Sequence, residues 1–204
     1  MKRIVLMALL VLALPVAAFA GSVGFNSSGG TLAGSTWGLS LTSSELTEVN
    51  GLGGLGLLQG AMGSLTFTTG ALVSGNLQTG GTFSSAGSSF VITGNGQGGI
   101  PNGIIFSGAF TGTVTWTENT NCGPNGAVCY TLMGSISGTW YNGTTVKGAT
   151  TQITFSVGKN GFSGSIPLAS GDTVITTVPE PGTLGLLGTG LLALAGLVRK
   201  KLKD

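Results

Sequence analysis

The sequence contains no histidine at all, and only 7% of its 204 residues are charged. Without an imidazole, Ser-His and Cys-His nucleophile pairs and His-ligated metal sites are excluded. The segment between the two chain ends has four carboxylates: Glu45, Glu48, Glu118 and Asp172. Glu45 and Glu48 lie in a polar, loop-like stretch, and Glu118 ends an expected strand, where solvated charges are the usual interpretation. We therefore expect no enzyme, no cofactor and no metal.

Basic residues are also scarce in the central segment, residues 21–178. Lys147 and Lys159 stand against the four acids, so this segment has a net charge of −2, although the whole chain has +2. Binding to a nucleic-acid backbone needs clustered Lys and Arg, so nucleic acid is not an expected partner. The glycine-rich run 94–99 is not followed by the Lys-Ser/Thr pair of a phosphate-binding loop.

The central segment consists largely of glycine (34 residues) and of serine or threonine (45 residues). Low charge and such a composition are common in disordered chains, but those chains also lack the aromatic and β-branched residues that alternate here. We predict an all-β fold over residues 21–175, an antiparallel β-sandwich or meander, with a barrel or a β-solenoid as alternatives. The absence of a repeat of fixed length counts against the solenoid.

Two stretches alternate most clearly, 104–117 and 130–140, with apolar residues and glycine at even positions. They predict one antiparallel hairpin in which the numbers of directly opposed residues add up to an even value. Cys122 and Cys129 are the only cysteines, and their numbers add up to an odd value. We therefore expect a disulfide between them in the connecting loop or across a bulge, because a redox motif has the spacing Cys-x-x-Cys and a metal site needs more ligands.

Turn signals predict two further hairpins. Asn160-Gly161 separates the alternating stretches 153–157 and 162–166, which would pair Phe155 with Ile166, and Asn142-Gly143 is a second such signal. Shorter strands are expected around 36–42, 65–67, 72–77, 83 and 90–92, whereas residues 50–63 have no clear period and suit a loop or a short helix.

An exposed row of hydroxyl groups is the candidate binding face. In the stretch 104–117 the odd positions from 111 onward hold threonines, which resemble the threonine ladders of ice-binding proteins, but such a row is also ordinary for a strand that faces water. Exposed tryptophans are an alternative platform for carbohydrate, although alternating aromatic residues are more typical of a core. The candidates are Thr111, Thr113, Thr115 and Thr117 for the face, and Trp37, Trp116 and Trp140 for the platform.

Both chain ends have the pattern of segments that lie outside the fold. At the N-terminus, Lys2 and Arg3 precede an apolar run, and Ala18 and Ala20 are the small residues that signal peptidase requires, so we predict cleavage of a signal peptide, residues 1–20. At the other end, an apolar run from 184 to 198 would span roughly 22 Å as a helix, against about 30 Å of hydrocarbon.

The C-terminal run is flanked by two distinctive groups of residues. Two prolines around a glutamate precede it and should stand extended at the membrane surface. Four basic residues follow it, and the positive-inside rule places them in the cytoplasm as a membrane stop. These residues are Pro179, Glu180 and Pro181 before the run, and Arg199, Lys200, Lys201 and Lys203 after it.

Residues 178–204 resemble the PEP-CTERM sorting signal of Gram-negative bacteria, and we predict that residues 176–204 form the sorting tail. The resemblance implies that exosortase, a membrane protease, recognises Pro179–Pro181, and that the protein crosses the inner membrane, stays there transiently and reaches the cell surface or the medium. It also implies an exopolysaccharide or biofilm context, and hence a structural protein of the extracellular matrix. The alternative is an adhesin-like module that binds carbohydrate or ice. Some classifications call this tail an ice-binding protein C-terminal domain, which names the tail and not an activity.

Overall fold

The computed structural model describes residues 21–123, 127–159, 161–177 and 190. Residues Ser22–Thr177 form one compact unit. The predicted signal peptide and, apart from residue 190, the predicted membrane helix fall outside the described residues. The described part of the chain is built from antiparallel strands, with two short 3-10 turns, η2 (Leu52–Gly54) and η3 (Gln97–Gly99), in the region 50–63 and near residue 98.

Thirteen strands are found within the described residues. In chain order they are β1 (Gly21–Ser28), β2 (Thr31–Ser35), β3 (Gly38–Asn50), β4 (Leu58–Thr68), β5 (Leu72–Asn76), β6 (Gly80–Phe83), β7 (Ser89–Asn95), β8 (Asn102–Phe110), β9 (Val114–Gly123), β10 (Ala127–Trp140), β11 (Thr145–Gly158), β12 (Ser165–Pro167) and β13 (Ser170–Thr177).

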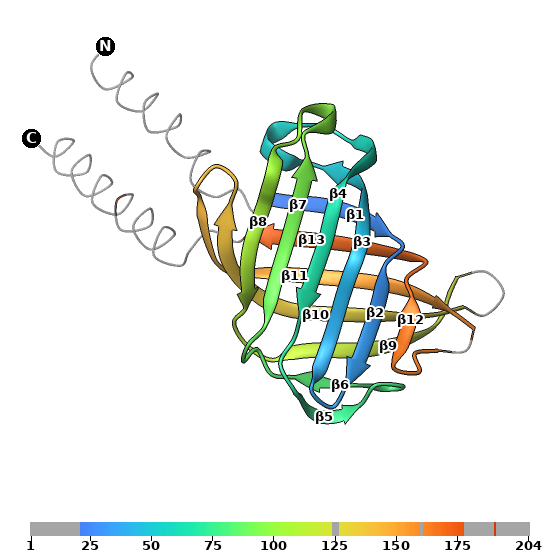
Figure 1. The fold of residues 1–204 in the computed structure, drawn as a ribbon. Helices are drawn as coiled ribbons and strands as arrows, with labels where there is room; N and C mark the ends of the chain where they lie inside the picture. The colour runs from blue at the N-terminus through green and yellow to red at the C-terminus, as the bar shows by residue number, and fades with distance from the viewer. Residues whose placement is uncertain (1–20, 124–126, 160, 178–189, 191–204) are drawn as a thin grey trace, which may run out of the picture. The chain divides into compact units, whose positions relative to one another are not determined.

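All these strands belong to one hydrogen-bonded sheet, and eight of them close into a ring. The order runs β11-β13-β1-β3-β4-β7-β8-β10, and β10 pairs back with β11. Figure 1 shows the result as two layers: β8, β7, β4, β3 and β2 lie in front, and β1, β13, β11, β10 and β9 cross behind them at a steep angle. Such crossing is typical of orthogonal sheet packing. The predicted antiparallel all-β class is confirmed, whereas a sandwich of separate sheets is not.

The even-number rule for the hairpin is confirmed, but the predicted single strand 104–117 is wrong at its centre. Phe110 lies opposite Ile136, and Trp116 lies opposite Leu132. Between these pairs the strand is broken at 111–113, so that β8 and β9 lie end to end along one edge of β10. A bulge in β8 against β7 also turns Ile104 outward, because Ile105 takes the buried position instead.

The turn at Asn142-Gly143 is confirmed, and the predicted pairing of Phe155 with Ile166 is wrong. Gly143 has a positive φ of 81° in the tight connection from β10 to β11. Phe155 lies opposite Tyr130 on one side and Gly171 on the other, so β11 has no free edge there. Ile166 pairs instead with Leu32 of β2.

Glycines on the inner face make room for aromatic rings. Gly138 of β10 lies directly opposite Gly108 of β8, and a β-carbon at Gly138 would meet the ring of Phe106 at 2.7 Å and the backbone of Ser107. The Phe106 ring packs in turn on Trp140, with 4.9 Å between ring centroids. The alternation of glycine with large apolar residues is therefore a packing pattern, in which each ring covers a neighbouring glycine.

A second aromatic cluster ties the loops to the core. The rings of Trp116 and Tyr130 stack with centroids 4.5 Å apart. The Tyr130 hydroxyl donates to the carbonyl oxygen of Gln78 (2.6 Å) and accepts from the backbone N–H of Phe162 (3.1 Å). Burial raises the pKa of Tyr130, the hydrogen bond from Phe162 opposes this and the negative charge of Glu118 adds to it, so the hydroxyl remains protonated at neutral pH.

The packing of Gly138 generates the first prediction. We expect Gly138→Ala to lower the free energy of unfolding by about 1–3 kcal/mol, because the added methyl group collides with Phe106 and the backbone of Ser107. Gly112→Ala is the matched control, since a β-carbon there meets no atom within 4 Å. Urea denaturation of both variants measures the difference, and equal stability of the two would contradict the packing argument.

Candidate binding face

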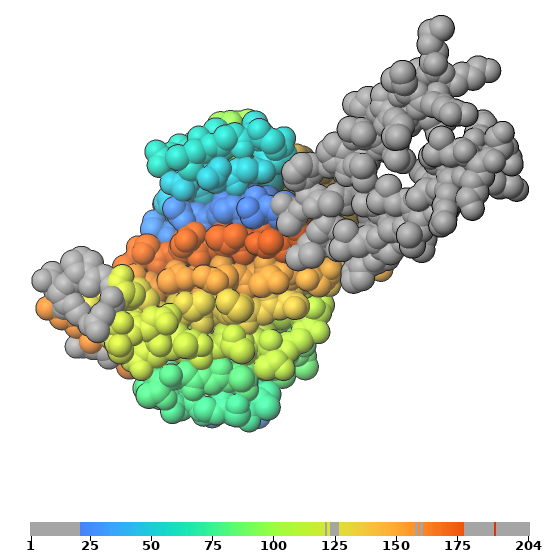
Figure 2. All heavy atoms as spheres, turned by 180° about the vertical axis from the view of Figure 1, so that it is seen from behind, coloured from blue at the N-terminus to red at the C-terminus, as the bar shows by residue number. Residues whose placement is uncertain are grey.

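The outward side chains of β9, β10, β11 and β13 form one polar surface, which we call the hydroxyl face. Figure 2 shows this back layer, with β1, β13, β11, β10 and β9 as successive bands. Direct cross-strand partners point to the same side of a sheet, so the registers arrange the face in rows. The rows are Asn119, Cys129, Ser156 and Ser170; Thr117, Thr131, Thr154 and Asp172; Thr115, Met133, Gln152 and Val174; and Ser135, Thr150 and Thr176.

The hydroxyl face is rich in neutral hydrogen-bonding groups. Nearly all of its members are half-buried or exposed, and Cys129 is the buried exception, at 6% exposure. Each Ser or Thr hydroxyl donates one hydrogen bond and accepts others. Asp172 is the single charged member of the rows. Such a surface favours a neutral, hydroxyl-rich partner over a strongly charged one, because it offers many hydrogen bonds and almost no net field.

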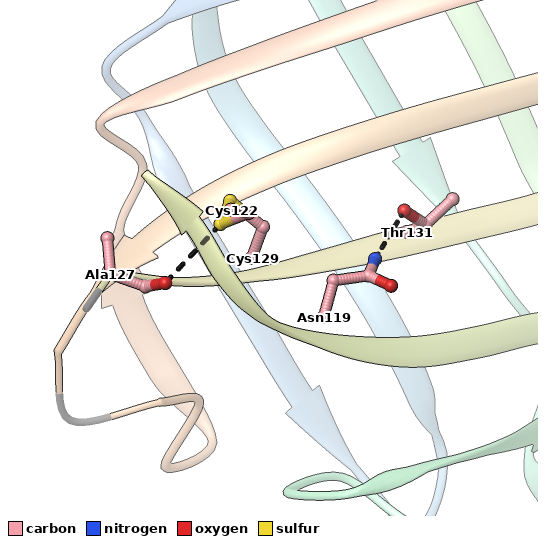
Figure 3. Close-up of a disulfide and its surroundings, with 5 residues drawn as sticks. All are labelled: Asn119, Cys122, Ala127, Cys129 and Thr131. Carbon is pink, nitrogen blue, oxygen red and sulfur yellow. Dashed lines mark hydrogen bonds between the residues drawn. A yellow bond between two sulfur atoms is a disulfide. The ribbon is translucent and has the colours of Figure 1, made fainter. Parts of the chain in front are cut away.

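Two hydrogen bonds on this face link β9 to β10. The Asn119 side-chain amide donates to the Thr131 hydroxyl (2.9 Å), as Figure 3 shows, and the Thr115 hydroxyl donates to the carbonyl oxygen of Met133 (3.2 Å). Both bonds hold side chains in place across the strand pair, which reduces the conformational entropy that a bound partner would have to remove.

The four threonines predicted as the binding face are all exposed, but they are not one strand row. Thr115 and Thr117 belong to the hydroxyl face, whereas Thr111 and Thr113 lie in the break between β8 and β9. Sequence reasoning missed the contribution of β11 and β13. In β11 the alternation of Thr150, Gln152, Thr154 and Ser156 was a usable signal, but its place beside β10 depends on the sheet register.

The three predicted tryptophan platforms differ sharply in exposure. Trp37, in the turn between β2 and β3, is 84% exposed. Trp116 is 1% exposed and stacked on Tyr130, so it belongs to the core and offers no ring face to a ligand. Trp140 is half-buried and packs on Phe106 and Phe25. Trp37 is therefore the one of the three that presents its ring to solvent.

The disulfide closes one end of the hydroxyl face. Cys122 of β9 and Cys129 of β10 are bonded, with 5.8 Å between their Cα atoms. The residue directly opposite Cys129 is Asn119, and a bulge follows between Val128 and Ala127, as the odd sum of the cysteine numbers required. In Figure 3 the Cys122 sulfur lies 3.5 Å from the carbonyl oxygen of Ala127, which is a close contact, because a disulfide sulfur has no hydrogen to donate.

The four carboxylates lie on three strands. Glu45 and Glu48 are in β3 and not in a loop as predicted, Glu118 is in β9 and Asp172 is in β13. The Gln59 side-chain amide donates to the Glu48 carboxylate (3.1 Å). Among the described residues, no group of three or more acidic or cysteine side chains is arranged to hold a metal ion. The absence of an enzymatic activity stays a prediction.

The comparisons with known proteins bear on the C-terminal tail. The family model of the PEP-CTERM protein-sorting motif matches residues 177–200. The tail is a PEP-CTERM sorting motif. It implies that the chain is exported, is processed by exosortase and reaches the cell surface or the extracellular space. Searches of curated proteins and of solved structures gave no match to the chain. Within the described residues, which include little of the PEP-CTERM segment, no helix is long and apolar enough to cross a membrane.

The disulfide generates the second prediction. We expect the double variant Cys122→Ser, Cys129→Ser to fold and to lose about 2–3 kcal/mol of unfolding free energy, because a closed loop of this length removes that much chain entropy from the unfolded state. Guanidinium denaturation of the oxidised protein and of the variant measures the loss. The same variant under reducing conditions is the control, since it should show no further change.

Proposed function

We propose that the protein is a non-enzymatic structural component of the cell surface or extracellular matrix, which associates with neutral exopolysaccharide through the hydroxyl face. The observation that carries the proposal is the combination of a PEP-CTERM tail with a folded unit whose outward rows are mostly Ser, Thr, Asn and Gln. Sugar hydroxyls are both donors and acceptors and match such rows, which hold a single carboxylate, Asp172.

The route to the surface follows from the two chain ends. Signal peptidase cleaves after Ala20 during export, and the apolar run before Arg199 holds the chain in the inner membrane until exosortase acts. Pro179, Glu180 and Pro181 precede the apolar run and are the residues that the protease recognises outside the membrane. The inner-membrane stage is therefore brief, and the folded unit Ser22–Thr177 is the part that acts at the surface.

Ice binding is the second candidate, and the registered rows are the observation that favours it. Thr117, Thr131 and Thr154 stand side by side on three strands. Asp172 ends this row of threonines, and Met133 and Val174 replace hydroxyls in the neighbouring row of Thr115 and Gln152. The face is therefore a better match for carbohydrate than for ice. Inhibition of ice recrystallisation by the folded protein separates the two candidates, because a carbohydrate-binding face has no reason to retard ice growth.

The sorting motif generates the third prediction. Replacing Pro179 and Glu180 with Ala should leave export intact and block removal of the tail, because the Pro-Glu-Pro element that exosortase recognises is lost. Intact mass with peptide mapping of both ends, on protein from the envelope and the medium of the native bacterium, measures this. The unaltered protein should begin at Gly21 and end near Pro179–Pro181. Efficient processing of the variant would contradict the proposal that exosortase recognises the Pro-Glu-Pro element.

The hydroxyl face generates the fourth prediction. The triple variant Thr117→Ala, Thr131→Ala, Thr154→Ala should reduce co-sedimentation with exopolysaccharide isolated from the native bacterium by about tenfold, which corresponds to about 1.4 kcal/mol of binding free energy. The matched control is Thr66→Ala, Ser107→Ala, two outward hydroxyls of the front layer in a row with Val91. Equal binding by both variants would place the contact elsewhere.

A further inference from the structure

Four large apolar side chains are exposed in segments that lie close together in the fold. Leu57 is 56% exposed, Ile104 57%, Tyr141 45% and Leu55 36%. Single exposed apolar residues are ordinary on a protein surface, but a group of them indicates an interaction site. We call Leu55, Leu57, Ile104 and Tyr141 the apolar end.

Backbone and side-chain contacts bring these residues together. The backbone N–H of Tyr141 donates to the carbonyl oxygen of Ile105 (2.8 Å), beside Ile104. The hydroxyl of Tyr141 lies against Gly53, where a β-carbon would come within 2.7 Å of it. The start of β8, the turn after β10 and the loop between β3 and β4 therefore meet at the apolar end.

β13, the last strand of the folded unit, ends beside the apolar end. The loop at Gly51 lies against the start of β1, where a β-carbon at Gly51 would be 3.0 Å from the carbonyl oxygen of Ser22. β13 is the neighbour of β1 in the sheet and ends at Thr177. Figure 1 shows the β13 arrow pointing toward the side on which β1 begins. The last strand therefore leaves the unit beside the apolar end.

The link from this end to the membrane-inserted run is short. Four residues, 178–181, separate Thr177 from Gly182, where the apolar and small residues begin. Four extended residues span at most about 14 Å. The headgroup layer of each leaflet is itself about 5–8 Å thick. While the tail is inserted, Thr177 is therefore held within about 9 Å of the lipid headgroups.

We propose that the apolar end lies in the headgroup region of the inner membrane while the uncleaved tail is inserted. The inference rests on the membrane insertion that the proposed function includes. Tyr141 has the amphipathic ring that favours this region, and the leucines and Ile104 bury apolar surface at the boundary of the acyl chains. The contact orients the folded unit on the membrane and keeps Pro179–Pro181 at the surface where exosortase cleaves. Cleavage removes the tether and thereby releases the apolar end.

A fluorescent probe at the apolar end tests the proposal. The two native cysteines are bonded to each other, so Leu57→Cys in the full chain supplies one thiol for an environment-sensitive dye. The labelled protein is reconstituted into vesicles of phosphatidylethanolamine and phosphatidylglycerol. We expect a blue-shifted emission and quenching by headgroup-labelled lipid. Val73→Cys, which is 67% exposed on β5 at the opposite end in Figure 1, is the matched control and should show neither effect.

Flotation of the same vesicles distinguishes insertion of the tail from contact of the apolar end with the membrane. Protein that floats with the lipid while the Leu57 probe emits as in water overturns the membrane contact but leaves the tail insertion standing. Protein that does not float overturns both. Equal quenching at Leu57 and Val73 also overturns the contact, because the unit would then have no preferred orientation. Insertion of ten Gly/Ser residues after Val178 should reduce the Leu57 signal, since it relaxes the tether.

Discussion

The packing of aromatic rings over glycines inside the closed sheet is the constraint on which the rest of the structure depends. Gly108 and Gly138 face each other across β8 and β10, and the Phe106 ring covers both, with Trp140 beyond it. A β-carbon on either glycine would displace this ring or the opposite backbone. Because rings fill the interior, the two crossing layers can belong to one sheet whose hydrogen bonds close on themselves.

Closure of the sheet explains how the folded unit avoids edge-to-edge association although it has few charged residues. Eight strands in a ring have no free edge along their paired length, so the unit needs few charged side chains to prevent edge-to-edge association. The outward positions are then available for Ser and Thr, which tolerate the strand conformation and bind water or sugar hydroxyls. The hydroxyl face on β9, β10, β11 and β13 and the apolar end beside β1 are thus two outer surfaces of one scaffold, with opposite chemistry.

Sequence patterns correctly predicted the features of this fold that form between segments adjacent in the chain. The even parity of the pairs between β9 and β10, the disulfide beside a bulge and the turn at Gly143 all belong to hairpins whose strands follow one another directly in the chain. The pairing of Phe155 with Ile166 failed because alternation identifies a face but not a partner, and β11 finds its partners in β10 and β13. The prediction that Ile104 shares the inward face with Phe106 failed because a bulge at Ile105 inverts the alternation on the N-terminal side of that bulge.

The sequence by itself determined that the protein is sorted to the cell surface or the extracellular space, and that its fold is of the β class. The Pro-Glu-Pro element, the apolar run and the basic residues after it are contiguous and are recognised as a linear motif, so no folding is needed to identify them. Period-2 alternation likewise determined the β class, because each strand imposes it locally. Only the tertiary structure decided which threonines share a face and that Trp116 is buried, since both depend on registers between strands far apart in the chain.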